Sequence, residues 1–316
     1  MLANMMDQPL LISSLIAHAA RYHGQTEIVS RTLDEGIHRY NWAEAEQRSK
    51  RLAKALIALG VQPGQRVGTM AWNTYRHLEA YYAIAGMGAV THTINPRLFP
   101  EQIEYIVNHA ENQFIFCDTS FADLVASLLP SFTTVKGIIF MCDRASMPSV
   151  VPEALCFEEL IAGQDADYTW PEFDERNAAA LCYTSGTTGN PKGALYSHRS
   201  TLLHTFAAIA PDGLGISASE TVLPVVPMFH VNAWGLPYAC AMVGAKMVMP
   251  GRDLDGASLH ELLDGEQVSL TAAVPAVWLG LLNHLRSTGA TLEHMKRVVI
   301  GGSACPRAMM ETFQDQ

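Results

Sequence analysis

The chain has 316 residues, of which 49% are hydrophobic and 16% are charged. This composition supports sizeable buried cores and excludes a disordered chain, and the length suggests two domains or one large domain with subdomains. A formal net charge of -10 argues against nucleic acid as a bulk electrostatic partner, because neutralising phosphates needs clustered Lys and Arg. One bound nucleotide needs only a few local donors and remains compatible with this charge.

The six cysteines show no C-x-x-C spacing that would indicate a metal site or a disulfide framework, so we expect free, mostly buried thiols in a reducing compartment. The apolar segment 9–20 has no Lys or Arg before it, which disfavours a signal peptide. Its apolar residues recur instead at the spacing of an amphipathic helix, at Leu11, Leu15, Ile16 and Ala19. No run reaches the about 18 uncharged apolar residues of a membrane span, so we expect a cytoplasmic protein.

Helices and strands alternate regularly from residue 41 onward. Asn41 followed by Glu44 resembles a capping box at a helix start, and Gly60 supplies a stop signal. The sequence then predicts strands at 66–72, 89–94, 114–117 and 137–141, separated by helices at 75–87, 101–110 and 121–129. This alternation indicates a parallel sheet with helices on both faces.

Residues 143–175 have little periodicity and several prolines, and we expect a surface connection there. A second alternation follows, with expected helices at 259–263 and 274–285 and expected strands at 178–183, 221–227, 246–249, 268–272 and 297–300. The fold class is therefore α/β, with two successive helix-flanked sheets. We expect residues 1–175 to form the first subdomain and residues 176–316 the second.

Residues 181–193, with the sequence LCYTSGTTGNPKG, carry the clearest chemical signal. Glycines let backbone N–H groups converge on an anion, hydroxyl groups add donors, and Lys192 adds a positive charge suited to phosphate. A Walker A loop is disfavoured, because Pro191 stands where a glycine is needed and Gly193 follows the lysine in place of Ser or Thr. The alternative is a Ser/Thr/Gly-rich hairpin that binds nothing.

Three motifs together resemble the adenylate-forming enzymes, which include acyl-CoA synthetases, peptide-synthetase adenylation domains and firefly-type luciferases. Residues 183–193 resemble their phosphate-binding signature, residues 227–235 (PMFHVNAWG) their second motif, and residues 301–304 (GGSA) their adenine loop. Segments 40–44, 60–64 and 88–97 are also similar to the family, so the resemblance covers essentially the whole chain.

Finer similarities point toward one group within these enzymes. Trp72-Asn73 and residues 92–98 resemble medium-chain fatty-acyl-CoA synthetases, and residues 8–31 resemble bacterial 3-methylmercaptopropionate-CoA ligases. The resemblance implies ligation of a carboxylic acid to coenzyme A through an acyl-AMP intermediate, with ATP and Mg²⁺. The expected partners are a short- or medium-chain fatty acid or 3-methylmercaptopropionate, ATP and coenzyme A, in a homodimer without nucleic acid.

The same resemblance assigns roles residue by residue. His230 and Lys192 would be catalytic, with His230 orienting the acyl carboxylate and gating the acyl pocket, and Thr184 would help to position Mg²⁺. The triphosphate would be held by Ser185, Gly186, Thr187, Thr188, Gly189 and Lys192. Adenine would lie against Gly301, Gly302 and Ser303, and the acid would meet His230, Asn232, Trp234 and Gly302.

Each of these residues also has a purely structural interpretation. His230 can be an ordinary polar residue of a loop, Trp234 a core residue, and residues 301–303 a plain turn at the end of a strand. Pro275 and Trp278 are explained equally well as another pocket wall and as helix-core packing.

The resemblance places further family features after residue 316: the aromatic-Gly-x-Thr-Glu motif, the ribose-binding Asp, the hinge and the lysine of a small C-terminal domain. We therefore expect residues 1–316 to be the N-terminal portion of such an enzyme and to be inactive alone. Two other functions stay open. One is adenylation with transfer to another acceptor, such as a carrier-protein thiol or an amine, and the other is a non-catalytic module that holds nucleotide or acid.

Overall fold

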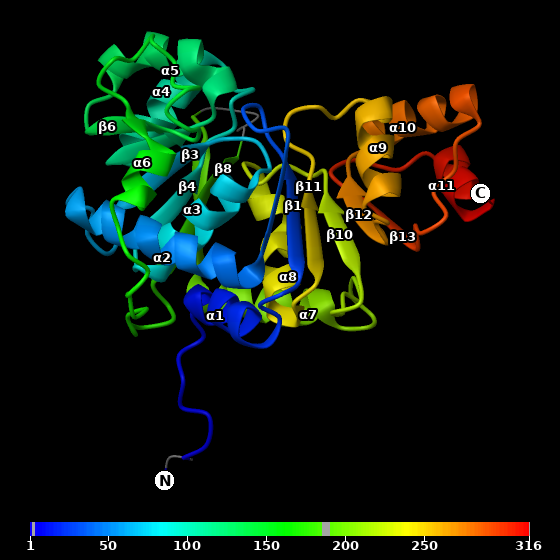
Figure 1. The fold of residues 1–316 in the computed structure, drawn as a ribbon, viewed down its shortest axis with the longest axis horizontal. Helices are drawn as coiled ribbons and strands as arrows, with labels where there is room; N and C mark the ends of the chain where they lie inside the picture. Colours follow the sequence, from blue (N-terminus) through cyan, green and yellow to red (C-terminus); the bar gives the residue numbers. More distant parts are fainter. Residues whose placement is uncertain (2–3, 185–189, 316) are drawn as a thin grey trace.

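The computed structural model describes residue 1, residues 4–184 and residues 190–315, and within these residues the strands form two sheets. Sheet A has the strand order β13 (Arg297–Ile300), β12 (Leu270–Ala273), β10 (Thr221–Pro224), β11 (Lys246–Met249), β1 (Glu27–Arg31) and β2 (Ile37–Asn41). Sheet B has the order β7 (Leu155–Cys156), β6 (Gly137–Phe140), β5 (Phe114–Cys117), β3 (Arg66–Met70), β4 (Val90–Thr93), β8 (Ala178–Thr184) and β9 (Lys192–Ser197). The two sheets lie side by side with helices between and outside them (Figure 1).

Both sheets are parallel except at one edge each. The pairs β1–β2 and β8–β9 are antiparallel, and the other pairs among the described strands are parallel. Central strands such as β4 and β5 are buried along their whole length, as parallel strands covered on both faces must be. The edge strand β9 is largely exposed.

The helices form three layers around the two sheets. The outer face of sheet B packs against α4 (Pro100–His109) and α5 (Ala122–Leu128). The outer face of sheet A packs against α9 (Gly256–Gly265), α10 (Pro275–Thr288) and α11 (Arg307–Asp315). Between the sheets lie α1 (Ile12–Tyr22), α2 (Trp42–Ala58), α3 (Tyr75–Gly86), α6 (Phe157–Ala162), α7 (His198–Ile209) and α8 (Leu236–Val243).

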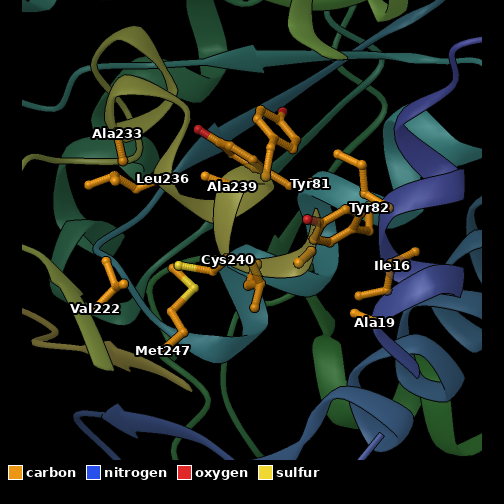
Figure 2. Packing of buried hydrophobic residues seen from close by; sticks show 14 of the residues in the cluster. Ile16, Ala19, Tyr81, Tyr82, Val222, Ala233, Leu236, Ala239, Cys240 and Met247 are labelled. Atoms are coloured by element: carbon orange, nitrogen blue, oxygen red, sulfur yellow. The ribbon is translucent and has the colours of Figure 1, made fainter. Parts of the chain in front are cut away.

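Helix α3 is the centre of this middle layer. All of its residues are buried, because one side packs in the core next to sheet A and the other in the core next to sheet B. Tyr81 and Tyr82 face α8 and α1 in the first of these cores (Figure 2). The helix therefore fixes the position of one sheet relative to the other.

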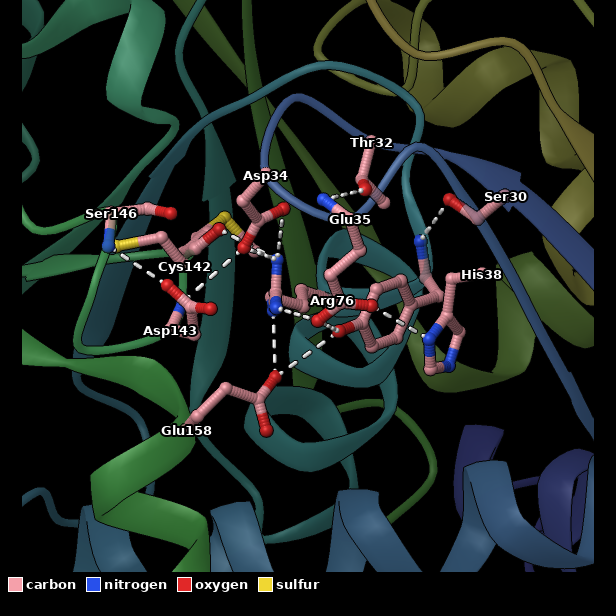
Figure 3. A network of polar contacts seen from close by, with 12 residues as sticks. Ser30, Thr32, Asp34, Glu35, His38, Arg76, Cys142, Asp143, Ser146 and Glu158 are labelled. Atoms are coloured by element: carbon pink, nitrogen blue, oxygen red, sulfur yellow. Dashed lines mark hydrogen bonds and ion pairs between the residues drawn. The ribbon is translucent and has the colours of Figure 1, made fainter.

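A buried ionic network ties the turn between β1 and β2 to helices α3 and α6. The Arg76 side chain is 2% exposed and contacts Asp34 at 2.9 Å, Glu35 at 2.7 Å and Glu158 at 2.7 Å (Figure 3). Charge-assisted hydrogen bonds of this kind satisfy a guanidinium that burial removes from water. The network joins three segments that are far apart in the sequence.

Several local predictions are confirmed. Asn41 and Glu44 form the expected capping box at the start of α2, and Gly60 follows that helix with φ 85°. Segment 12–22 is the expected amphipathic helix, and β5, β11 and β13 have the expected bounds. All six cysteines are free, and five are buried. Within the described ranges, no helix is both long and apolar enough to cross a membrane.

Other elements differ from the sequence-based expectation. The strand expected at 221–227 ends at Pro224, and the segment expected as a plain connection contains β7 and α6. The strand pairing also differs from a division into residues 1–175 and 176–316, because β1 and β2 join sheet A whereas β8 and β9 join sheet B. Sequence order does not determine which sheet a strand joins, since that choice depends on long-range pairing.

Candidate functional site

The segments singled out by the sequence meet at the carboxyl ends of parallel strands. Strand β8 ends at Thr184, β10 is followed by the loop 225–230, and β13 is followed by Gly301. A hydrogen bond of 3.4 Å from the Cys182 thiol to Asn232 Oδ1 joins β8 of sheet B to the segment that follows β10 of sheet A. In open α/β sheets, ligands bind in the crevice outside this edge.

A cavity of about 200 Å³ opens at this edge. Its wall combines polar groups, including two threonine hydroxyls and the His230 imidazole, with apolar side chains. The lining residues come from β4, α4, β8, β9 and the loops after β4 and β10: Thr93, Asn95, Leu98, Ile106, Cys182, Tyr183, Thr184, Ala194, Tyr196, Phe229, His230 and Val231. Such a mixed lining suits a ligand with a polar and an apolar part.

The expected phosphate-binding residues fall partly outside the described residues. This applies to Ser185, Gly186, Thr187, Thr188 and Gly189. The residues that flank them are described, and the antiparallel register places Thr184 opposite Lys192. The Thr184 hydroxyl donates a hydrogen bond of 3.4 Å to the Lys192 carbonyl oxygen, and both residues are exposed. Thr184 lines the cavity, and the backbone of Lys192 thus lies next to it.

His230 lies at the cavity wall and precedes an unusual turn, η3 (Val231–Gly235). The φ angles of Val231, Asn232, Ala233 and Trp234 are 47°, 50°, 50° and 55°, and that of Gly235 is 78°. Left-handed backbone costs about 1–2 kcal/mol per non-glycine residue, so runs of this kind are rare. Gly235 and, to a lesser degree, Asn232 are residue types that favour this conformation, whereas Val231, Ala233 and Trp234 are not, so residue types do not predict the whole run.

Buried contacts hold the middle of this left-handed turn. The Asn232 side chain is 7% exposed and accepts hydrogen bonds at 3.4 Å from both the Tyr81 hydroxyl and the Cys182 thiol. Ala233 is fully buried in the core between the sheets (Figure 2). Burial raises the pKa of the Cys182 thiol, so at neutral pH it is an uncharged donor.

Trp234 lies against Gly301. A Cβ added at Gly301 would stand 2.8 Å from Cη2 of the indole, so the absence of a side chain there is what admits the ring. Trp234 is partly buried and packs on the core between the sheets. Gly302 has φ 79°, and both Gly302 and Ser303 are exposed. The structure thus brings the second motif and the expected adenine loop into contact.

Two further observations refine the list of candidate residues. Trp278 is fully buried and packs edge-on against Phe313 under sheet A, which agrees with helix-core packing rather than a pocket wall. The guanidinium of Arg97 lies 5.8 Å from the centre of the Trp72 ring and 5.7 Å from that of Phe229. Because Phe229 lines the cavity, this cation–π cluster adds a positive charge next to it. Spacing along the chain gives no signal for such a contact.

Comparisons with known proteins agree with this geometry. The model of the AMP-binding enzyme family matches residues 15–316. The chain is 55% identical to the 3-methylmercaptopropionyl-CoA ligase of Ruegeria lacuscaerulensis and 51% identical to the medium-chain-fatty-acid–CoA ligase of Ectopseudomonas oleovorans. These alignments cover 100% of the chain but 59% and 58% of those proteins, so the chain spans less than two thirds of the length of these relatives.

A solved structure shows the same fold. The anthranilate CoA ligase AuaEII, in complex with anthranoyl-AMP, superposes with a TM-score of 0.87 at 19% identity, over 99% of this chain and 59% of that one. The family match extends over both sheets and includes the loop after β8, the turn after β10 and the end of β13. The chain therefore belongs to the family of AMP-binding enzymes.

Proposed function

We propose that the protein carrying this chain is an ATP-dependent carboxylate–CoA ligase, which forms an acyl-AMP and then transfers the acyl group to coenzyme A. The observation that carries the proposal is the cavity that Thr184 and His230 both line, at the junction of two sheets, in a chain that is 55% identical to a CoA ligase. In the first step a carboxylate oxygen attacks the α-phosphorus of ATP and pyrophosphate leaves. In the second step the thiol of coenzyme A attacks the acyl carbon and AMP leaves.

Charge neutralisation is the main demand of the first step, because an anion approaches a polyanion. Lys192 supplies a positive charge at the start of β9, and we assign it to the phosphates together with residues 185–189. The Thr184 hydroxyl is an oxygen donor of the kind that Mg²⁺ accepts, so Thr184 would hold that ion, which neutralises phosphate charge when bound. Gly301, Gly302 and Ser303, after β13, would receive adenine.

The acid would enter beside the left-handed turn. His230 orients the carboxylate, while Asn232, Trp234 and Gly302 border the acyl part. The motif 227–235 contains no Asp or Glu that would pair with an ammonium group, which favours an apolar acid over an amino acid. We propose a short- or medium-chain fatty acid or 3-methylmercaptopropionate as the substrate. A homodimer and a cytoplasmic location stay predictions.

The test uses the full-length protein with ATP, Mg²⁺ and a panel of acids, with and without coenzyme A. We expect acid-dependent pyrophosphate release and, when coenzyme A is present, an acyl-CoA that mass spectrometry identifies. Acyl-AMP that accumulates without consumption of coenzyme A would favour another acyl acceptor. Nucleotide binding without any pyrophosphate release would favour a non-catalytic module.

A further inference from the structure

Asn73 connects the two sheets next to the site. It lies in the turn between β3 and α3, and it is 3% exposed. Its side-chain Nδ2 donates hydrogen bonds to the carbonyl oxygens of Pro224 at 2.8 Å and Val226 at 2.9 Å. Its Oδ1 accepts a hydrogen bond of 2.7 Å from the backbone N–H of Met228. One amide from sheet B thus holds three backbone groups of the loop that follows β10 in sheet A.

The chemistry of these contacts admits little substitution. Both N–H groups of the amide face carbonyl oxygens and its oxygen faces an N–H, so only one orientation of the amide satisfies all three partners. The main-chain carbonyl oxygen of Asn73 also accepts a hydrogen bond of 3.1 Å from the backbone N–H of Gly251, which follows β11. An aspartate would keep the acceptor but present a carboxylate oxygen to two carbonyl oxygens.

The clamped loop leads directly into the left-handed turn. Met228 also accepts a hydrogen bond from the Tyr81 hydroxyl, and the N–H of His230 donates one of 3.0 Å to the Pro227 carbonyl oxygen. The turn then starts at Val231, whose backbone lies in the left-handed region that non-glycine residues rarely adopt. Strained backbone persists only where the surrounding structure over-determines its conformation. Asn73 fixes the upstream end, and the contact of Trp234 with Gly301 fixes the downstream end.

We propose that Asn73 is a positioning residue, which holds the loop 224–228 so that His230 faces the carboxylate of the acid. Asn73 is not among the described residues that line the cavity, so it acts through the loop rather than on the substrate. The role of His230 in this inference rests on the proposed function, whereas the clamp itself rests on the hydrogen bonds.

The experiment compares Asn73→Ala and Asn73→Asp with Asn112→Ala in the full-length protein. Asn112 is a matched control, because it is a fully buried asparagine next to sheet B whose amide bonds to His92 and not to the loop 224–228. We expect both Asn73 variants to lower kcat for acyl-AMP formation by about 10²-fold, the loss that a misplaced catalytic group causes. The Kd for ATP should stay within about threefold of wild type, because the described hydrogen bonds of Asn73 go to residues 224–228 and to Gly251, not to β8 or β9. Asn112→Ala should have the same kcat as wild type when the rate is divided by the concentration of folded protein.

A double-mutant cycle with His230→Ala separates positioning from general damage. If Asn73 acts through His230, Asn73→Ala should cause little further loss of kcat in the His230→Ala background. An equal loss in both backgrounds, or wild-type kcat in both Asn73 variants, would overturn the proposal. Asn73→Asp nearly preserves the side-chain volume and serves in the cycle if Asn73→Ala does not fold.

Hydrogen exchange tests the clamp without any reference to activity. The amides of Met228 and Ala233 should exchange faster in Asn73→Ala than in wild type, because the bond to Met228 is lost and the turn is released. The same amides should be unchanged in Asn112→Ala. If wild type forms no acyl-AMP with any acid, the proposed function fails. The exchange rates alone then test whether Asn73 holds the loop 224–228. Unchanged exchange at both amides would refute it.

Discussion

Replacing Gly301 by alanine tests the contact between the end of β13 and the indole of Trp234. The new Cβ would stand 2.8 Å from Cη2, 3.1 Å from Cζ2 and 3.4 Å from Cζ3 of that ring. Carbon atoms in contact lie about 3.5–4.0 Å apart, so the ring has to move away by roughly 1 Å. A tryptophan ring is rigid, and the movement therefore displaces the left-handed turn that carries it.

The expected cost follows from overpacking. Insertion of a methyl group into a packed contact destabilises a protein by about 1–3 kcal/mol. If Trp234 borders the acyl pocket, the displaced ring also changes the preference between acids that differ by one methylene, by about tenfold in kcat/KM. Both effects have the same physical origin and should appear together.

The assay combines denaturant unfolding with a chain-length profile, in the full-length protein. Trp234→Ala removes the ring that clashes, so Gly301→Ala should cost close to nothing in the Trp234→Ala background. The control is Gly280→Ala on α10, where an added Cβ meets nothing within 4 Å. The reasoning is refuted if Gly301→Ala costs the same with and without the indole. A chain-length profile that neither Gly301→Ala nor Trp234→Ala changes would place Trp234 in the structural core.

Three further outcomes are expected. Lys192→Ala should lower acid-dependent pyrophosphate release by about 10–10²-fold through loss of a charge-assisted contact, while acid binding measured by calorimetry changes little. Arg76→Ala should lower the free energy of unfolding by about 3–5 kcal/mol, because it leaves the buried Asp34 carboxylate without its ion-pair partner, and a loss below about 1 kcal/mol would contradict this. Burial lowers the pKa of three histidines from 6.5 to about 4, so each is neutral when folded and takes up a proton on unfolding: His77, His92 and His198. The contribution of each histidine to the free energy of unfolding is complete above pH 6.5 and is lost as the pH falls toward 4. Near pH 5.5 the free energy of unfolding is lower by about 1.4 kcal/mol for each histidine. Denaturant unfolding at a series of pH values measures the slope, and equal stability at about pH 8 and pH 5.5 would contradict the assignment.

Local signals in the sequence determine the individual helices and strands. The capping box of Asn41 and Glu44, the helical periodicity before Gly60 and the apolar runs at β5, β11 and β13 each act over a few residues. The same holds for the motif at residues 183–193, since a run of glycines and hydroxyl residues followed by a lysine can be recognised in the sequence without knowledge of the fold. Such features depend on neighbours along the chain, and they are therefore predictable from the sequence alone.

Tertiary contacts alone decide how these pieces combine. Whether β1 joins sheet A and β8 joins sheet B depends on partners more than eighty residues away, and no local period encodes that choice. The left-handed turn from Val231 to Gly235 contradicts the local preference of Val231, Ala233 and Trp234, and it persists because buried contacts outweigh the strain. The contact of Trp234 with Gly301 likewise exists only after the segments that follow β10 and β13 meet in space. The sequence therefore indicates the candidate site residues but not their geometry.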